Sequence, residues 1–125
     1  GCLIDFDHVL EYFFVYGLNF NLLNFLAGKQ FLRSDKIYIV FHAWEWLVVL
    51  SGLVYLLRKR RLIKIFLVTL ILAMFIHLIS DVFINRFPIK FYSISYRYVH
   101  NFSAPELLSP EQWAKNLELK KTLSF

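Results

Sequence analysis

The sequence predicts an all-α integral membrane protein: a helical hairpin, a third embedded helix and a short soluble helix at the C-terminus. Of the 125 residues, 58% are hydrophobic and 19% are aromatic. Two long apolar runs, residues 37–57 and 62–84, exceed what a chain of this length can bury in a single soluble core. The four basic residues between the runs, Arg58 to Arg61, are typical of a connector at a membrane surface.

The first predicted element covers residues 9–27. This stretch is apolar enough to enter a bilayer, although Glu11 and several asparagines interrupt it, and Gly28 fits the position that ends a helix. We expect a third, polar-studded membrane helix, with a helix lying in the membrane interface as the alternative. Residues 29–36 form a polar connector.

The hairpin comes next. Residues 37–57 contain no Lys or Arg, and 21 residues are about the length that crosses the hydrocarbon of a bilayer as a helix. In residues 62–84 the only Lys or Arg is Lys64, which lies close enough to the end to reach the headgroups. These two spans and their connector predict an antiparallel hairpin.

The composition changes after residue 85. Pro88 ends the helical pattern, and Arg86, Lys90 and Arg97 return among tyrosines, which is typical of a segment at the lipid headgroups. Residues 109–112, Ser-Pro-Glu-Gln, form a capping box that predicts a soluble helix ending near residue 121. We therefore divide the chain into a membrane-embedded domain, residues 1–102, and a polar tail, residues 103–125.

The net charge is +5, which together with the apolar runs indicates anionic membrane lipids as the counter-charge and no nucleic acid partner. The sequence has no arginine-rich stripe interleaved with aromatic side chains of the kind that base stacking would need. Cys2 is the only cysteine and cannot close an internal disulfide. We expect an integral protein of the cell (inner) membrane.

Ionisable side chains inside membrane helices are costly, so their positions are informative. His42 and Glu45 are spaced i, i+3, and His77 and Asp81 are spaced i, i+4, so each pair projects from one helix face. The two histidines lie equally far from the middle of the connector. They should therefore lie at the same depth in the hairpin.

A third polar cluster opens the first helix. Asp5, Asp7 and His8 lie there, and Glu11 shares their helix face. Imidazole and carboxylate groups together suit Zn²⁺, Mn²⁺ or Fe²⁺, and the number of candidates allows one or two ions, with Zn or Mn expected. Glu45 is the expected general base and Glu11 the second choice. The predicted metal ligands are Asp5, Asp7, His8, His42, His77 and Asp81.

Each cluster also has a simpler interpretation. His42 and Glu45 can form a buried ion pair, and Asp5 and Asp7 can serve only as helix N-caps. His77 and Asp81 can simply lie at an interface if the second span is shifted. His100 has no such neighbours and is expected at headgroup level.

Three stretches carry a family resemblance: residues 1–8, which read Gly-x-x-x-Asp-x-Asp-His, residues 41–46 around His42, and residues 77–81, which read His-x-x-x-Asp. In this order they resemble the LexA-regulated, membrane-bound metal-dependent hydrolase family and its uncharacterised relatives. The second motif of that family is usually of a Thr-His-Ser type, whereas here it reads Phe41-His42-Ala43. Members also tend to carry a helix before the first motif, which this sequence does not show.

The resemblance implies a metal-dependent hydrolase, but it does not imply a substrate. A fainter likeness to zinc-dependent phospholipases C, all-helical enzymes with His-x-x-x-Glu/Asp ligand pairs, would point to phosphoesters of lipids. We expect an ester or phosphoester of a small molecule or a lipid, hydrolysed through a metal-activated water. By analogy, Arg86 and Arg97 could then hold a phosphate group.

Two other function classes stay open. Two histidines at equal depth are also what a b-type haem with bis-imidazole ligation needs, although Glu45 and Asp81 beside them favour a hard divalent ion. A non-catalytic membrane partner protein could use the same buried pairs only for helix association. Elemental analysis with an absorption spectrum would separate these classes.

Overall fold

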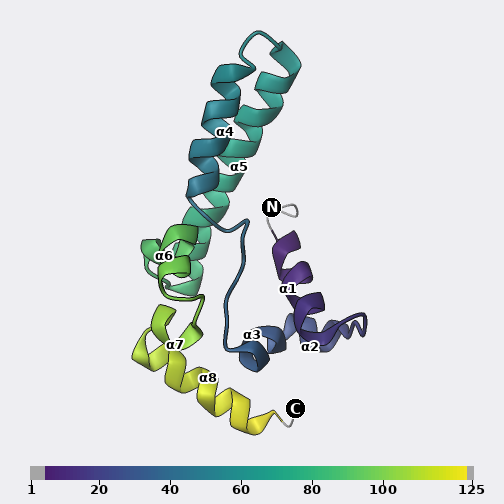
Figure 1. The fold of residues 1–125 in the computed structure, drawn as a ribbon, viewed down its shortest axis with the longest axis vertical. Coiled ribbons are helices and arrows are strands. Elements are labelled where there is room, and N and C mark those ends of the chain that lie inside the picture. Colours follow the sequence, from purple (N-terminus) through teal and green to yellow (C-terminus); the bar gives the residue numbers. More distant parts are fainter. Residues whose placement is uncertain (1–4, 124–125) are drawn as a thin grey trace.

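The computed structural model describes residues 5–123, and the regular elements in that range are helical, with one isolated β-bridge between Lys36 and Ser103 (Figure 1). The all-α class is thus confirmed for the described residues. In chain order the elements are α1 (Phe6–Tyr16), α2 (Leu22–Leu26), α3 (Lys29–Ser34), α4 (Glu45–Leu56), α5 (Arg61–Asn85), the 3₁₀ helix η1 (Ile89–Tyr92), α6 (Ile94–Val99), α7 (Ala104–Leu107) and α8 (Pro110–Thr122).

Helices α4 and α5 pack side by side as an antiparallel pair that projects away from the rest of the molecule (Figure 1). With 25 residues, α5 is about 37 Å long, and it is the one helix among residues 5–123 long and apolar enough to cross a membrane. Only 17% of its most apolar window is buried, so it does not resemble the core helix of a soluble protein. Helix α4, at 12 residues or about 18 Å, is too short to span alone.

Much of the apolar surface of α5 faces outward. Large hydrophobic side chains are exposed along most of its length, at Leu62, Ile63, Ile65, Phe66, Val68, Leu72, Phe75, Ile76, Phe83 and Ile84. An apolar surface this extensive is unusual on a soluble monomer and normally has an apolar partner or lipid against it. The helix is therefore suited to a hydrocarbon environment.

The predicted helix over residues 37–57 is wrong in its first part, because α4 begins only at Glu45. The preceding segment is extended and then turns. Its peptide N–H groups donate to the carboxylates of Asp7 and Glu11, and several of its carbonyls accept from Arg97. These side chains replace the hydrogen bonds that a helix would supply.

The predicted single helix over residues 9–27 is also wrong, because the structure divides it into α1 and α2. Gly17, with φ +66°, ends α1, and the side chain of Asn21 accepts from the Asn24 N–H to cap α2. The Asn21 N–H in turn donates to the Tyr12 hydroxyl. The predicted connector that follows contains α3, against which both α1 and α2 pack.

The C-terminal helix is confirmed, since α8 begins at the capping box formed by Ser109 and Gln112 and ends at Thr122. It packs against α3, and Lys120 forms an ion pair with Asp35 at 2.6 Å. The tail is therefore folded back onto the N-terminal helices.

The buried core lies at the base of the hairpin rather than along it. It joins the last part of α5 to the extended segment, η1 and α7, through Ile37, Ile39, Met74, Leu78, Phe91, Tyr92, Ala104, Leu107 and Leu108. This packing holds three distant parts of the sequence together. The candidate site lies beside it.

Candidate metal site

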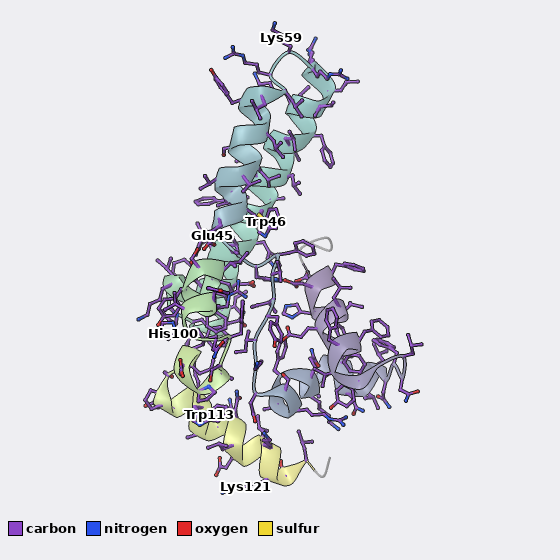
Figure 2. The ribbon with its side chains drawn as sticks, viewed as in Figure 1. Glu45, Trp46, Lys59, His100, Trp113 and Lys121 are labelled. Atoms are coloured by element: carbon purple, nitrogen blue, oxygen red, sulfur yellow. The ribbon has the colours of Figure 1, made fainter. Side chains whose placement is uncertain are left out.

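Three segments bring the predicted site residues together. The start of α1 supplies Asp5, Asp7 and His8, the turn before α4 supplies His42, and the last part of α5 supplies His77 and Asp81. In Figure 1 the N-terminal end of α1 lies opposite the chain that leads into α4, and Figure 2 shows side chains filling the space between them.

Four ligand-type atoms converge on the two imidazoles: Nε2 of His42 and Nε2 of His77, with Oδ1 of Asp5 and Oδ2 of Asp81 each close to both nitrogens. The two nitrogens are 3.2 Å apart. The Asp5 oxygen lies 3.4 Å from His77 and 3.5 Å from His42, and the Asp81 oxygen lies 3.4 Å and 3.6 Å from the same nitrogens.

Each carboxylate oxygen forms, with the two imidazole nitrogens, a triangle that matches one face of a tetrahedral coordination sphere. An ion with bonds of about 2.0–2.1 Å to nitrogen and oxygen needs ligand atoms about 3.3–3.4 Å apart, because a tetrahedron's edge is about 1.63 times its centre-to-corner distance. The observed values, 3.2–3.6 Å, bracket that length. One ion can therefore lie within bonding distance of both imidazoles and of either carboxylate, and the Asp5, His42 and His77 atoms form a group close enough to hold a metal.

Asp7 contacts the opposite side of the His42 ring. Its Oδ2 lies 3.0 Å from Nδ1 of His42 and also accepts from the N–H groups of Phe41 and His42. An Nδ1–H directed at this carboxylate leaves the lone pair of Nε2 facing the shared point, the arrangement in which carboxylates commonly orient metal-bound histidines. Burial opposes the charge of Asp7, but the His42 contact and the nearby His8 keep its pKa below the ordinary value.

His8 lies beside the four atoms without being one of them. Its ring centroid is 4.8 Å from that of His42, and its edge meets the ring of Phe31. Burial and the neighbouring His42 lower the pKa of His8, while Asp7 and Asp5 oppose that shift. With Asp7 and His42, His8 forms a second group whose ligand atoms lie close enough to hold a cation.

The two expected bases have other partners. The carboxylate of Glu45 accepts from the Ser93 hydroxyl and, at 3.0 Å, from the Ser95 N–H. This carboxylate therefore caps the start of α6, although Glu45 itself is the first residue of α4. Glu11 accepts from the N–H groups of Tyr38 and Ile39, and burial raises its pKa to about 7 against the opposing effect of those bonds. Among the interactions of residues 5–123, neither carboxylate contacts the four converging atoms.

The sequence did not reveal the role of Arg97. Its fully buried guanidinium donates to the carbonyls of Tyr38, Ile39 and His42, so it supports the segment that carries His42 and is not free to hold a phosphate. No local pattern marks such a role, because the partners lie more than 50 residues away. Arg86 ends α5 in a left-handed conformation.

Two further predictions can be compared with the structure. The side chain of Asp5 makes no N-capping hydrogen bond, so the simple capping interpretation does not describe it. The Nδ1 atom of His100 lies 2.8 Å from the carbonyl of Tyr96, and His100 is not part of the cluster.

A cavity of about 260 Å³ adjoins the cluster, and His8, His42 and Asp81 form part of its lining. The carboxylate of Asp5 is about half exposed. The converging atoms are thus accessible both from the cavity and from the side of Asp5.

Comparisons of the chain with protein-family models, with curated proteins and with solved structures gave no match.

Proposed function

We propose that the chain is a membrane-associated, metal-dependent hydrolase that binds a divalent ion, of the Zn²⁺ or Mn²⁺ kind, through Asp5, His42, His77 and Asp81. The observation that carries the proposal is that an oxygen of Asp5 and an oxygen of Asp81 each lie 3.4–3.6 Å from the same two imidazole nitrogens, which are themselves 3.2 Å apart. The donor set combines imidazole and carboxylate, as in hydrolytic metal sites.

The charges around the point also favour a cation. Asp5 and Asp81 lie within 3.6 Å of both imidazoles, and Asp7 lies 3.0 Å from that of His42. With neutral histidines this group carries three negative charges, and Asp7 is almost fully buried. A divalent ion offsets two of those charges and uses the imidazole lone pairs, which makes the burial tolerable.

Hydrolysis requires water and a proton acceptor near the ion. A bound divalent ion would lower the pKa of a coordinated water, and the cavity and the half-exposed Asp5 leave room for that water. His8 lines that cavity and is not among the four ligands, and burial lowers the pKa of its imidazole, which favours the neutral form. We therefore propose His8 as the proton acceptor in place of Glu45 and Glu11, whose carboxylates are bonded elsewhere.

The proposed substrate is an ester or a phosphoester, a class that divalent metal sites hydrolyse. A membrane location is supported by the exposed apolar surface of α5 and by its length. We propose that this membrane is the cell (inner) membrane. We also propose that the resemblance of residues 1–8, 41–46 and 77–81 to the metal-dependent hydrolase family reflects a shared activity.

The geometry disfavours the haem alternative. Bis-imidazole ligation places the plane of the macrocycle between two Nε2 atoms. Here the carboxylate oxygens of Asp5 and Asp81 lie within 3.6 Å of the facing Nε2 atoms of His42 and His77, where that plane would have to pass.

The test uses detergent-purified full-length protein. We expect elemental analysis to find one divalent ion per chain, no Soret band, and turnover of micellar esters or phosphoesters that a chelator abolishes and Zn²⁺ or Mn²⁺ restores. The His42→Ala and His77→Ala variants should lose metal to the same extent, whereas His100→Ala should retain it. A Soret band, or hydrolysis unaffected by the chelator, would overturn the proposal.

The membrane part has its own test. The protein should stay with membranes in high salt and alkaline carbonate, because α5 is held by apolar burial rather than by charge. Release by salt alone would exclude a spanning helix.

A further inference from the structure

The cavity next to the converging atoms has a lining of mixed chemistry. His8, His42 and Asp81, which belong to the candidate metal site and its surroundings, form part of it, and Asn85, Tyr92 and Asn116 add further polar groups. Most of the remaining lining is apolar and comes from α3, the extended segment, η1 and the C-terminal helices: Phe31, Leu32, Ile37, Ile39, Phe87, Phe91, Leu108 and Leu119. A molecule that fills the cavity from the metal site outward therefore needs a polar head and an apolar body.

We propose that this cavity binds the alkyl or acyl chain of a single-chain amphiphile whose polar group lies at the metal site. The inference rests on the proposed metal site and extends it by naming the substrate class. Hydrolysis itself is not needed for the binding.

The size of the cavity supports a chain rather than a bulky body. Apolar cavities of about 150 Å³ hold a benzene ring. The 260 Å³ here exceeds that volume, but it is at the lower limit of sites that enclose whole drug-sized ligands. A short chain, or the proximal part of a longer one, fits this volume, and the rest would leave past the rim.

The rim can be located from exposure. Ala27 lines the cavity although its side chain is exposed, and Leu119 on α8 lines it while 43% exposed. Both positions are distant from the four converging atoms in sequence and are not among the metal-site contacts. A large side chain at either position should fill the cavity without removing a ligand.

The experiment uses full-length protein in detergent loaded with Co²⁺, whose visible absorption reports ligand binding. The probes are straight-chain hydroxamic acids from two to eight carbons, which pair a metal-binding head with a chain of graded length. In the wild type we expect the Kd to fall about three- to fourfold for each added methylene until the cavity is full, the gain for burying a methylene group.

Two variants should remove this gain. Ala27→Trp and Leu119→Trp should make the Kd nearly independent of chain length while the Co²⁺ spectrum is retained, which also shows that the variants fold. Ala114→Trp is the matched control, because Ala114 is an exposed alanine on α8 that does not line the cavity. In this variant the Kd should depend on chain length as it does in the wild type. Partitioning of the longer hydroxamates into detergent micelles affects both proteins equally.

The outcomes separate the two proposals. A Kd independent of chain length in Co²⁺-loaded wild type, or an unchanged dependence in both cavity variants, overturns the chain-binding inference and leaves the metal site standing. If Co²⁺ fails to give a spectrum of imidazole and carboxylate coordination, the metal site and this inference both fall. If the chain dependence holds but no ester or phosphoester is hydrolysed, the binding inference is supported and only the hydrolytic role is lost.

Discussion

Replacing Asp7 with Asn tests how the metal site is built. Asp7 Oδ2 contacts Nδ1 of His42 at 3.0 Å and also accepts from the N–H of Phe41 at 2.9 Å and, more weakly, from that of His42 at 3.3 Å. The amide of Asn removes the negative charge that orients and polarises the imidazole, but it leaves Asp5, His42, His77 and Asp81 in place.

The expected loss is intermediate. Carboxylates that hold a metal-bound histidine typically contribute a factor of about 10–100 in metal affinity, or about 1.4–2.7 kcal/mol. Asp7→Asn should therefore weaken binding by that factor and still fill at high metal concentration, whereas His77→Ala should not fill. Competition against a chromophoric chelator at fixed pH measures both, with circular dichroism to check the fold.

Asp35→Asn is the matched control, because that carboxylate pairs with Lys120 away from the site and should leave the affinity unchanged. Two results would refute the reasoning. If Asp7→Asn loses metal as completely as His77→Ala, then Asp7 is a direct ligand, as the sequence alone predicted. If Asp7→Asn binds metal as tightly as the wild type, the carboxylate does not orient His42.

Three other perturbations give separate predictions. The buried Glu11 carboxyl has a pKa of about 7 instead of 4.5, so its contribution to stability is complete below about pH 4.5 and is lost as the pH rises through 7, by about 3 kcal/mol. Thermal unfolding of metal-free protein between pH 5 and 8 should show this fall in stability, and Glu11→Gln should flatten it. An equal fall in the variant would exclude Glu11 as its source. His8→Gln should keep the metal and lower kcat by about 10²–10⁴-fold if His8 accepts the proton; Glu45→Gln is the comparison, and a larger kcat loss there would return that role to Glu45. Arg97→Met should destabilise the fold by several kcal/mol, because buried carbonyls lose their donor at about 1–3 kcal/mol each; denaturant unfolding measures this, and a change below about 1 kcal/mol would show that the guanidinium is dispensable.

The convergence of His42 and His77 was predicted from the sequence, but partly for the wrong reason. The prediction placed both residues on helices at equal depth, whereas His42 lies in the turn before α4. The two histidines nevertheless lie at the same depth, because the turn packs at the same end of the hairpin as the last part of α5. Composition could not distinguish the extended segment from a helix, since buried apolar residues are typical of both.

What the sequence could predict depended on the range of the interactions. The start of α8 was predictable because Ser109 and Gln112 cap it within one turn. The partners of Glu45 lie 48 and 50 residues away, and those of Glu11 lie 27 and 28 residues away. Nothing in their immediate neighbourhood signals such bonds, so both were assigned to catalysis.

The extended segment before α4 also bears on the order of events during synthesis. The partners of its N–H groups, Asp7 and Glu11, are synthesised before the segment itself. The partner of its carbonyls, Arg97, leaves the ribosome only after the whole of α5. His42 therefore cannot be held in position until α5 and α6 have both been synthesised and α6 has folded against the base of the hairpin. Under the proposed function, metal loading would follow this step, because a shorter nascent chain would hold the ligands apart and would not compete for the ion.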